Sequence, residues 1–130
     1  MSMPHRVAPV DPFDLPEWLG VEPVTWHGES SIDGRTHRVS GRLTTTSGSL
    51  PCDVLACDLA FPRPVLPDQW RSEAHSAWSR EEVLLVEDDG RMTLAAPGSA
   101  VDADLVLEAV RRLAKAVGAA PERFTVTLRL

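Results

Sequence analysis

Proline is the residue that most restricts the fold of this chain, because it fixes its own φ angle and has no amide hydrogen to donate. Of the eleven prolines in 130 residues, five lie before residue 24 and three lie between residues 62 and 67. Neither stretch can form a long helix or a central strand. We therefore expect a proline-rich acidic arm over residues 1–23 and a single folded domain over residues 24–130, a length that suits one domain.

The first part of the domain reads as a β-hairpin. An Asp-Gly pair at positions 33–34 is a strong signal for a two-residue turn, here between residues 24–32 and 35–46. With that loop length Trp26 lies opposite Gly41, and the hairpin separates into one polar face and one apolar face. We expect the apolar face, which includes Trp26, to point into the core.

A second turn at Ser47-Gly48 predicts a third strand over residues 51–61. If this loop also holds two residues, Leu43 lies opposite Cys52. The outward face of the strand becomes apolar towards its end, and something has to cover it: the arm, the next segment or another subunit. Its members are Leu55, Cys57, Leu59 and Phe61.

The second half of the chain predicts two helices and three strands. Trp70, Ala74, Ala77 and Trp78 recur at helical spacing over residues 69–79. A second Asp-Gly pair, at 89–90, predicts a hairpin between residues 83–87 and 91–96, with Leu85 opposite Leu94. Residues 103–117 carry a wide apolar arc and predict the longest helix, capped by Ser99 or Asp102. Strict alternation over residues 123–130 predicts a half-buried last strand.

This order of elements, β-β-β-α-β-β-α-β, predicts an α+β fold. Runs of hairpins favour an antiparallel sheet, and a helix with a wide apolar stripe has to bury it on that sheet. We expect five or six mostly antiparallel strands with one long C-terminal helix packed on them.

Charge and composition argue against several classes of protein. The net charge is −6 and the chain has a single Lys, whereas nucleic-acid-binding proteins cluster Lys and Arg. No apolar stretch approaches the roughly 20 residues of a membrane span, and the first residues lack the apolar region of a secretion signal. We expect a cytoplasmic protein with no nucleic-acid or membrane partner.

The two cysteines point to no cofactor or metal. Cys52 and Cys57 lie five residues apart, which on a strand places them on opposite faces, so they cannot form a disulfide with each other. Two cysteines with scattered histidines also fall short of the about four ligands that zinc needs. We expect two buried thiols.

One polar constellation could carry chemistry. In the two predicted registers Ser30 lies opposite His37, and His37 lies opposite Asp58. A Ser, a His and an Asp in one row match the geometry of nucleophilic catalysis, in which His accepts the hydroxyl proton and Asp orients the ring. No Gly-x-Ser-x-Gly elbow accompanies Ser30, and a polar sheet end is the simpler interpretation. A hydrolase is therefore the least favoured of three functions.

The favoured function is a non-catalytic protein-interaction module, with self-association as its simplest form. Apolar residues in the arm and on the outward sheet face could form the contact surface: Phe13, Trp18, Leu19, Leu55, Leu59 and Phe61. The alternative is a small-ligand-binding domain whose pocket is lined by Trp26, Trp70 and Trp78, with few placed polar groups.

Overall fold

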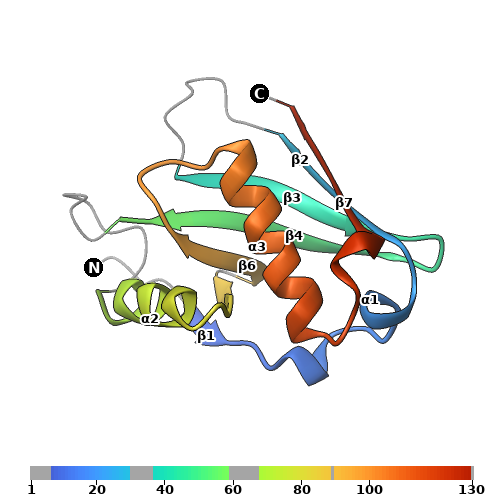
Figure 1. Cartoon of the computed structure of the whole chain (residues 1–130), viewed down its shortest axis with the longest axis horizontal. Helices are drawn as coiled ribbons and strands as arrows, with labels where there is room; N and C mark the ends of the chain where they lie inside the picture. Colours follow the sequence, from blue (N-terminus) through green and yellow to red (C-terminus); the bar gives the residue numbers. More distant parts are fainter. Residues whose placement is uncertain (1–6, 30–36, 59–67, 89, 130) are drawn as a thin grey trace.

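A computed structural model describes residues 7–29, 37–58, 68–88 and 90–129 of the chain (Figure 1). Three α-helices, two 3-10 helices (η) and the strands of one sheet follow one another along these residues. Their bounds are β1 (Val7–Pro9), η1 (Pro12–Asp14), α1 (Trp18–Val21), β2 (Val24–Glu29), β3 (Arg38–Thr44), β4 (Ser49–Cys57), α2 (Asp68–Ser79), β5 (Leu84–Asp88), β6 (Arg91–Pro97), α3 (Ala103–Ala116), η2 (Pro121–Arg123) and β7 (Phe124–Arg129).

The strands form one mixed sheet in the order β1-β5-β6-β4-β3-β2-β7. Four neighbouring pairs are antiparallel, while β4–β6 and β2–β7 are parallel. The α+β class is therefore correct, but the expected count of five or six strands is too low. The seventh strand comes from the arm: Val7–Pro9 pairs with β5 at the edge of the sheet, a position where a strand proline is tolerated.

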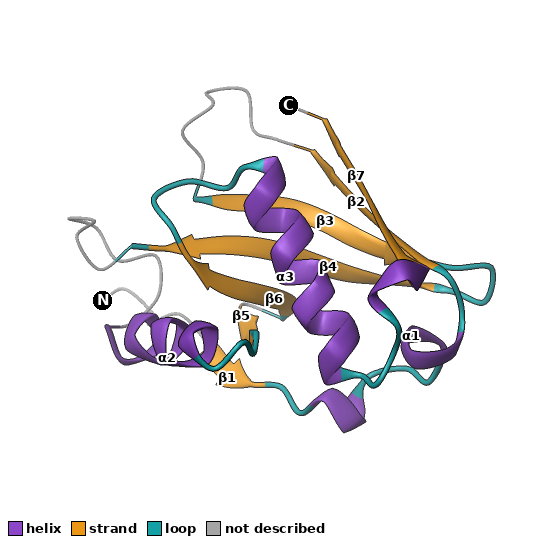
Figure 2. Ribbon diagram, in the orientation of Figure 1, coloured by secondary structure: helices purple, strands orange, loops and turns teal. Residues whose placement is uncertain are grey.

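The main core lies between one face of the sheet and α3, which runs across that face (Figure 2). Asp102 caps this helix, since its carboxylate accepts a hydrogen bond of 2.7 Å from the backbone N–H of Leu105. The helix was predicted over 103–117 and ends one residue earlier. Its buried side chains are Val106, Ala109, Val110, Leu113 and Ala114.

The opposite face of the sheet is covered in part by α2. Side chains from this helix and from β4, β5 and β6 form a second, smaller apolar cluster. Of the apolar outward face expected for β4, Leu55 and Cys57 are thus covered by the next segment of the same chain, while Leu59 and Phe61 lie outside the described residues. The buried members are Leu55, Cys57, Trp70, Ala74, Val86 and Ala95.

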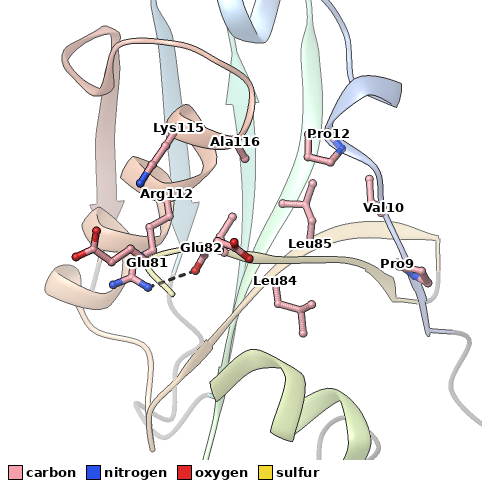
Figure 3. A pocket seen from close by; sticks show the side chains of 11 residues that line it. Pro9, Val10, Pro12, Glu81, Glu82, Leu84, Leu85, Arg112, Lys115 and Ala116 are labelled. Atoms are coloured by element: carbon pink, nitrogen blue, oxygen red, sulfur yellow. Dashed lines mark hydrogen bonds between the residues drawn. The ribbon is translucent and has the colours of Figure 1, made fainter. Parts of the chain in front are cut away.

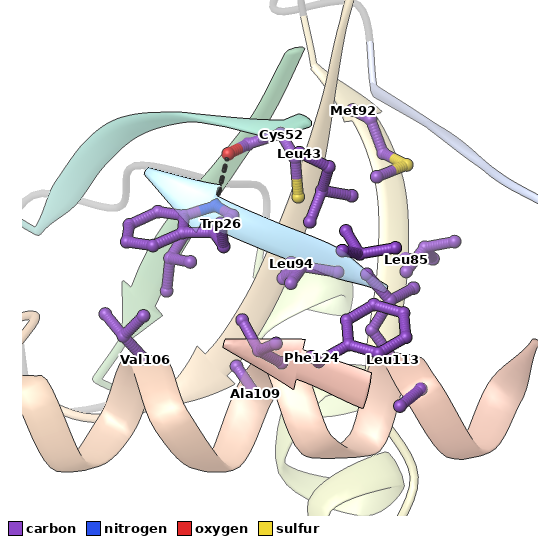
Figure 4. Close-up of a cluster of buried hydrophobic side chains, with 14 of the residues drawn as sticks. Trp26, Leu43, Cys52, Leu85, Met92, Leu94, Val106, Ala109, Leu113 and Phe124 are labelled. Carbon is purple, nitrogen blue, oxygen red and sulfur yellow. Dashed lines mark hydrogen bonds between the residues drawn. The ribbon is translucent and has the colours of Figure 1, made fainter. Parts of the chain in front are cut away.

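The first hairpin has the predicted faces but the wrong register. Trp26 lies opposite Leu43, and Gly28 lies opposite Gly41, a shift of two residues from the expected pairing of Trp26 with Gly41. The reason is the size of the indole, which lies over both glycines: a Cβ atom at either glycine would overlap its ring. The buried indole Nε1 also donates a hydrogen bond of 2.8 Å to the carbonyl of Cys52 (Figure 4).

The second hairpin is shifted by two residues in the same way. Leu43 lies opposite Leu50 rather than Cys52, because the turn is centred on Thr46 and Ser47, one residue earlier than the expected Ser47-Gly48 pair. Thr45 closes that turn: its amide donates to the carbonyl of Gly48 at 2.8 Å, and its hydroxyl accepts from the amides of Ser47 and Gly48. A shift by two keeps every side chain on its predicted face.

The third hairpin and the last strand agree with the sequence. Leu85 lies opposite Leu94, and β7 runs over six of the eight predicted residues, parallel to β2. The α2 helix includes all of the predicted 69–79 segment.

Candidate functional site

A network of charged side chains crosses the middle strands on the sheet face that α2 only partly covers. Asp53 of β4 is 1% exposed and accepts hydrogen bonds from Arg38 of β3 at 2.7 Å and from Arg91 of β6 at 2.9 Å. Arg38 also pairs with the equally buried Asp88 of β5. Two guanidinium groups and two carboxylates thus tie four neighbouring strands together.

The network holds Asp53 in its charged form. Burial alone would raise the pKa of this carboxyl, but hydrogen bonds from Arg91, Arg38 and the backbone amide of Gly41 outweigh it and lower the pKa below its ordinary value. With no oxygen of Asp53 open to a substrate proton at neutral pH, this carboxylate suits the positioning of arginines better than acid–base chemistry.

A groove lies on the other side of the molecule, between the arm, the α2–β5 connection and the C-terminal half of α3 (Figure 3). We call it the arm groove. It has a volume of about 480 Å³ and a mainly apolar lining. Its lining residues are Pro9, Val10, Pro12, Glu81, Glu82, Val83, Leu84, Leu85, Arg112, Lys115 and Ala116.

Arg112 fixes one wall of the arm groove. Its guanidinium lies 3.5 Å from the centre of the Trp78 ring and donates to the Trp78 carbonyl at 2.8 Å and the Glu82 carbonyl at 3.3 Å. It also pairs with Glu108 one turn earlier on α3. One cation thus joins the end of α2 and the following loop to α3 along this wall.

The arm, which forms the opposite wall, continues directly into an exposed apolar side chain. Asp11 caps the short η1 turn by accepting a hydrogen bond of 2.9 Å from the amide of Phe13, directly after the groove residue Pro12. Phe13 is 94% exposed, the highest value among the large apolar side chains of the described residues. A capped turn therefore displays a phenyl ring to solvent at the residue that follows Pro12 of the groove wall.

The other predicted contact residues have different positions. Leu19 is fully buried in the main core and Leu55 is buried under α2, so neither can contact a partner. Trp18 packs partly buried against the main core. Leu59 and Phe61 lie outside the described residues. Of the proposed contact residues, only Phe13 is exposed to a partner in the described part of the chain.

The predicted catalytic row is only partly described. The amide of Ala56 donates to the carbonyl of His37, so the observed register places Ala56, rather than Asp58, beside His37. Asp58 follows the end of β4, and Ser30 lies outside the described residues. The expected pairing of His37 with Asp58 is therefore not observed. The pairing of Ser30 with His37 stays a prediction.

The three tryptophans do not share a pocket. Trp26 is buried in the main core under α3, and Trp70 belongs to the cluster under α2 on the opposite face of the sheet. Trp78 stacks on Arg112 behind the wall of the arm groove. A cavity lined by all three is therefore wrong, because the sheet separates two of them.

Sequence reasoning missed the arm groove, whose walls come from segments far apart in the chain. It also missed the network around Asp53, since a lone Asp in an apolar strand carries no motif. The one available signal was that Asp53 interrupts a run of buried residues, which a charged group does only with partners.

Comparison of the chain with protein-family models, with curated proteins and with solved structures gives no match. No helix within the described residues has the length and apolar character needed to cross a membrane. Nor do those residues hold a cluster of three or more His, Cys, Asp or Glu side chains placed to bind a metal.

Proposed function

We propose that the protein is a non-catalytic interaction module that self-associates, with Phe13 of one copy seated in the arm groove of a second copy. The observation that carries the proposal is the pairing of an exposed phenyl ring with an apolar groove beside it on the same chain. An exposed aromatic anchor and an apolar pocket are the elements that dominate the energy of protein interfaces.

A twofold arrangement fits this geometry. In a symmetric dimer each contact occurs twice, so each copy both offers Phe13 and receives the ring of its partner. The rim of the groove carries both signs of charge, from Glu81, Glu82, Arg112 and Lys115. Two copies of a mixed rim can meet without net repulsion, which a rim of one sign would not allow.

Light scattering after size exclusion, over a range of protein concentrations, tests the proposal. We expect a dimer whose dissociation constant rises about 30-fold or more in Phe13→Asp, because loss of an interface anchor costs about 2 kcal/mol or more. Val21→Asp is the matched control: it removes another exposed apolar side chain of the arm, 66% exposed, that is not adjacent in sequence to a groove residue. A monomeric parent protein, or a Phe13→Asp variant that dimerises as well as the parent, overturns the proposal.

A second candidate is a small-ligand-binding domain that uses the same groove, since about 480 Å³ falls in the range of small-molecule sites. Ala116→Trp narrows the groove and distinguishes the two. A monomeric parent whose unfolding temperature rises with an apolar ligand, and no longer does so in Ala116→Trp, supports the ligand site instead of the dimer.

A further inference from the structure

The part of the sheet that α2 leaves open contains a second, smaller hollow. It has a volume of about 250 Å³ and lies over β2, β3 and the start of β6. We call it the basic hollow, because two of its lining side chains are arginines and no lining residue is acidic. Its lining residues are His27, Ser40, Gly41, Arg42 and Arg91.

The strand register brings these polar side chains to one place. His27 of β2 lies directly opposite Arg42 of β3, and Ser40 lies two residues before Arg42 on the same face. Arg91 approaches from β6, where its guanidinium reaches the buried Asp53 and the Gly41 carbonyl. Three strands thus supply a ring nitrogen, a hydroxyl and two guanidinium groups to one hollow.

Hydrogen bonds to other side chains of the protein orient both guanidinium groups. Arg91 donates to Asp53 through Nε at 3.0 Å and Nη2 at 2.9 Å, and Arg42 donates through Nε to the hydroxyl of Ser49 at 3.1 Å. Within the described part of the chain, Nη1 of Arg91 and both terminal nitrogens of Arg42 bond to no protein group. These N–H donors are thus positioned before any ligand arrives, which reduces the entropy lost on binding.

The local charge is positive although the whole chain carries −6. Asp53 and Asp88 balance Arg38 and Arg91 two against two, whereas Arg42 pairs with no carboxylate in the described residues. An anion in the hollow would therefore meet at least one uncompensated cation.

We propose that the basic hollow binds the phosphate group of a small phosphomonoester. Guanidinium groups suit phosphate because their planar N–H donors match pairs of phosphate oxygens. A hydroxyl and an imidazole provide donors from two further directions, which fits a tetrahedral group better than a planar carboxylate.

An NMR titration of the ¹⁵N-labelled protein with inorganic phosphate at constant ionic strength tests the proposal. We expect the amides of His27, Ser40, Gly41 and Arg42 to shift together and to saturate, and glycerol 3-phosphate to give the same response. Acetate at the same ionic strength should give much smaller changes in the chemical shifts of these amides. Constant ionic strength matters because exposed charges respond to salt alone.

Arg42→Gln should weaken phosphate binding about tenfold, since it removes charge-assisted hydrogen bonds. Arg111→Gln removes the same charge from the outer surface of α3 and should leave binding unchanged. Unchanged spectra with phosphate, an equal response to acetate, or equal weakening by the two substitutions overturns the proposal. So does binding to phosphatidic acid vesicles without binding to free phosphate, which would assign the site to a lipid headgroup.

Discussion

Asp53 joins three strands through a single carboxylate. It belongs to β4, and it accepts hydrogen bonds from Arg38 and the Gly41 amide of β3 and from Arg91 of β6. A buried carboxylate is stable only when its oxygens are satisfied in this way. Its replacement therefore removes partners from two arginines at once.

We expect Asp53→Asn to lower the free energy of unfolding by about 2–3 kcal/mol, measured by urea denaturation. Breaking a buried ion pair costs about 3–5 kcal/mol, and we reduce this because the arginine side chains are 30% and 41% exposed. Glu73→Gln, an exposed acid on α2, is the matched control and should change stability by less than about 0.5 kcal/mol. Equal effects of the two substitutions would contradict a stabilising network.

The same carboxylate makes a pH-dependent contribution. Because the pKa of Asp53 is lower in the folded protein than in the unfolded chain, its contribution is complete above about pH 4 and is lost as the pH falls through the folded-state pKa. The parent protein should therefore lose more stability than Asp53→Asn as the pH is lowered below about 4.

At the scale of elements, periodicity and turn residues located the helices and the hairpin strands, but they did not locate the turn after β3 to the residue. The turn after β3 depends on hydrogen bonds that the amides of Ser47 and Gly48 donate to the hydroxyl of Thr45, and the register of β2 depends on two glycines under one indole. Neither of these two features can be deduced from the local pattern of apolar and turn residues in the sequence. The errors in strand register were shifts by two residues, which leave the same side chains on the buried face. The core residues were therefore predictable from the sequence, although their cross-strand partners were not.

The start of α3 offers a test at this scale. The sequence left Ser99 and Asp102 as alternative caps, and only Asp102 makes the capping hydrogen bond. Asp102→Ala should reduce the free energy of unfolding by about 1 kcal/mol, and Ser99→Ala should leave it unchanged in the same thermal or urea experiment. A larger loss in Ser99→Ala would show that the cap is misassigned.

At the scale of the whole molecule, the sheet separates the two thiols into two different cores. Cys52 lies under α3 and Cys57 under α2, both with no exposed surface. Burial raises the pKa of Cys57 to about 11 and that of Cys52 further still. A thiol that is both covered and protonated does not react as a nucleophile.

We therefore expect neither thiol to react with Ellman's reagent at pH 8 in the folded protein, and both to react at once in urea. Under mild denaturation the two should be modified at the same rate, because exposure of either core requires unfolding of the shared sheet. Modification of one thiol within minutes in buffer would show that its cover opens independently.

The candidate sites were the least predictable part, since each is assembled from distant segments. The arm groove joins residues 9–12, 81–85 and 112–116, and the basic hollow joins β2, β3 and β6. Of the contact residues suggested by the sequence, Phe13 is exposed, since a phenylalanine among prolines and acids has no local partner to cover it, and its role in a contact stays a prediction. Leu19 and Leu55 looked equivalent and differ only through tertiary packing.

The pairing of β2 with β7 has a consequence for the order of folding. Thr25 and Thr125 share a hydrogen bond across 100 residues of chain, the most distant kind of contact this sheet contains, and distant contacts form late because they close large loops. During synthesis the hairpin of β2 and β3 is complete long before residues 124–129 leave the ribosome. For that interval β2 is the outermost strand with its backbone groups unpaired, the condition in which strands join neighbouring chains. Pairing with β7 ends this exposure, so a strand formed late in folding protects the open edge of β2, which forms early.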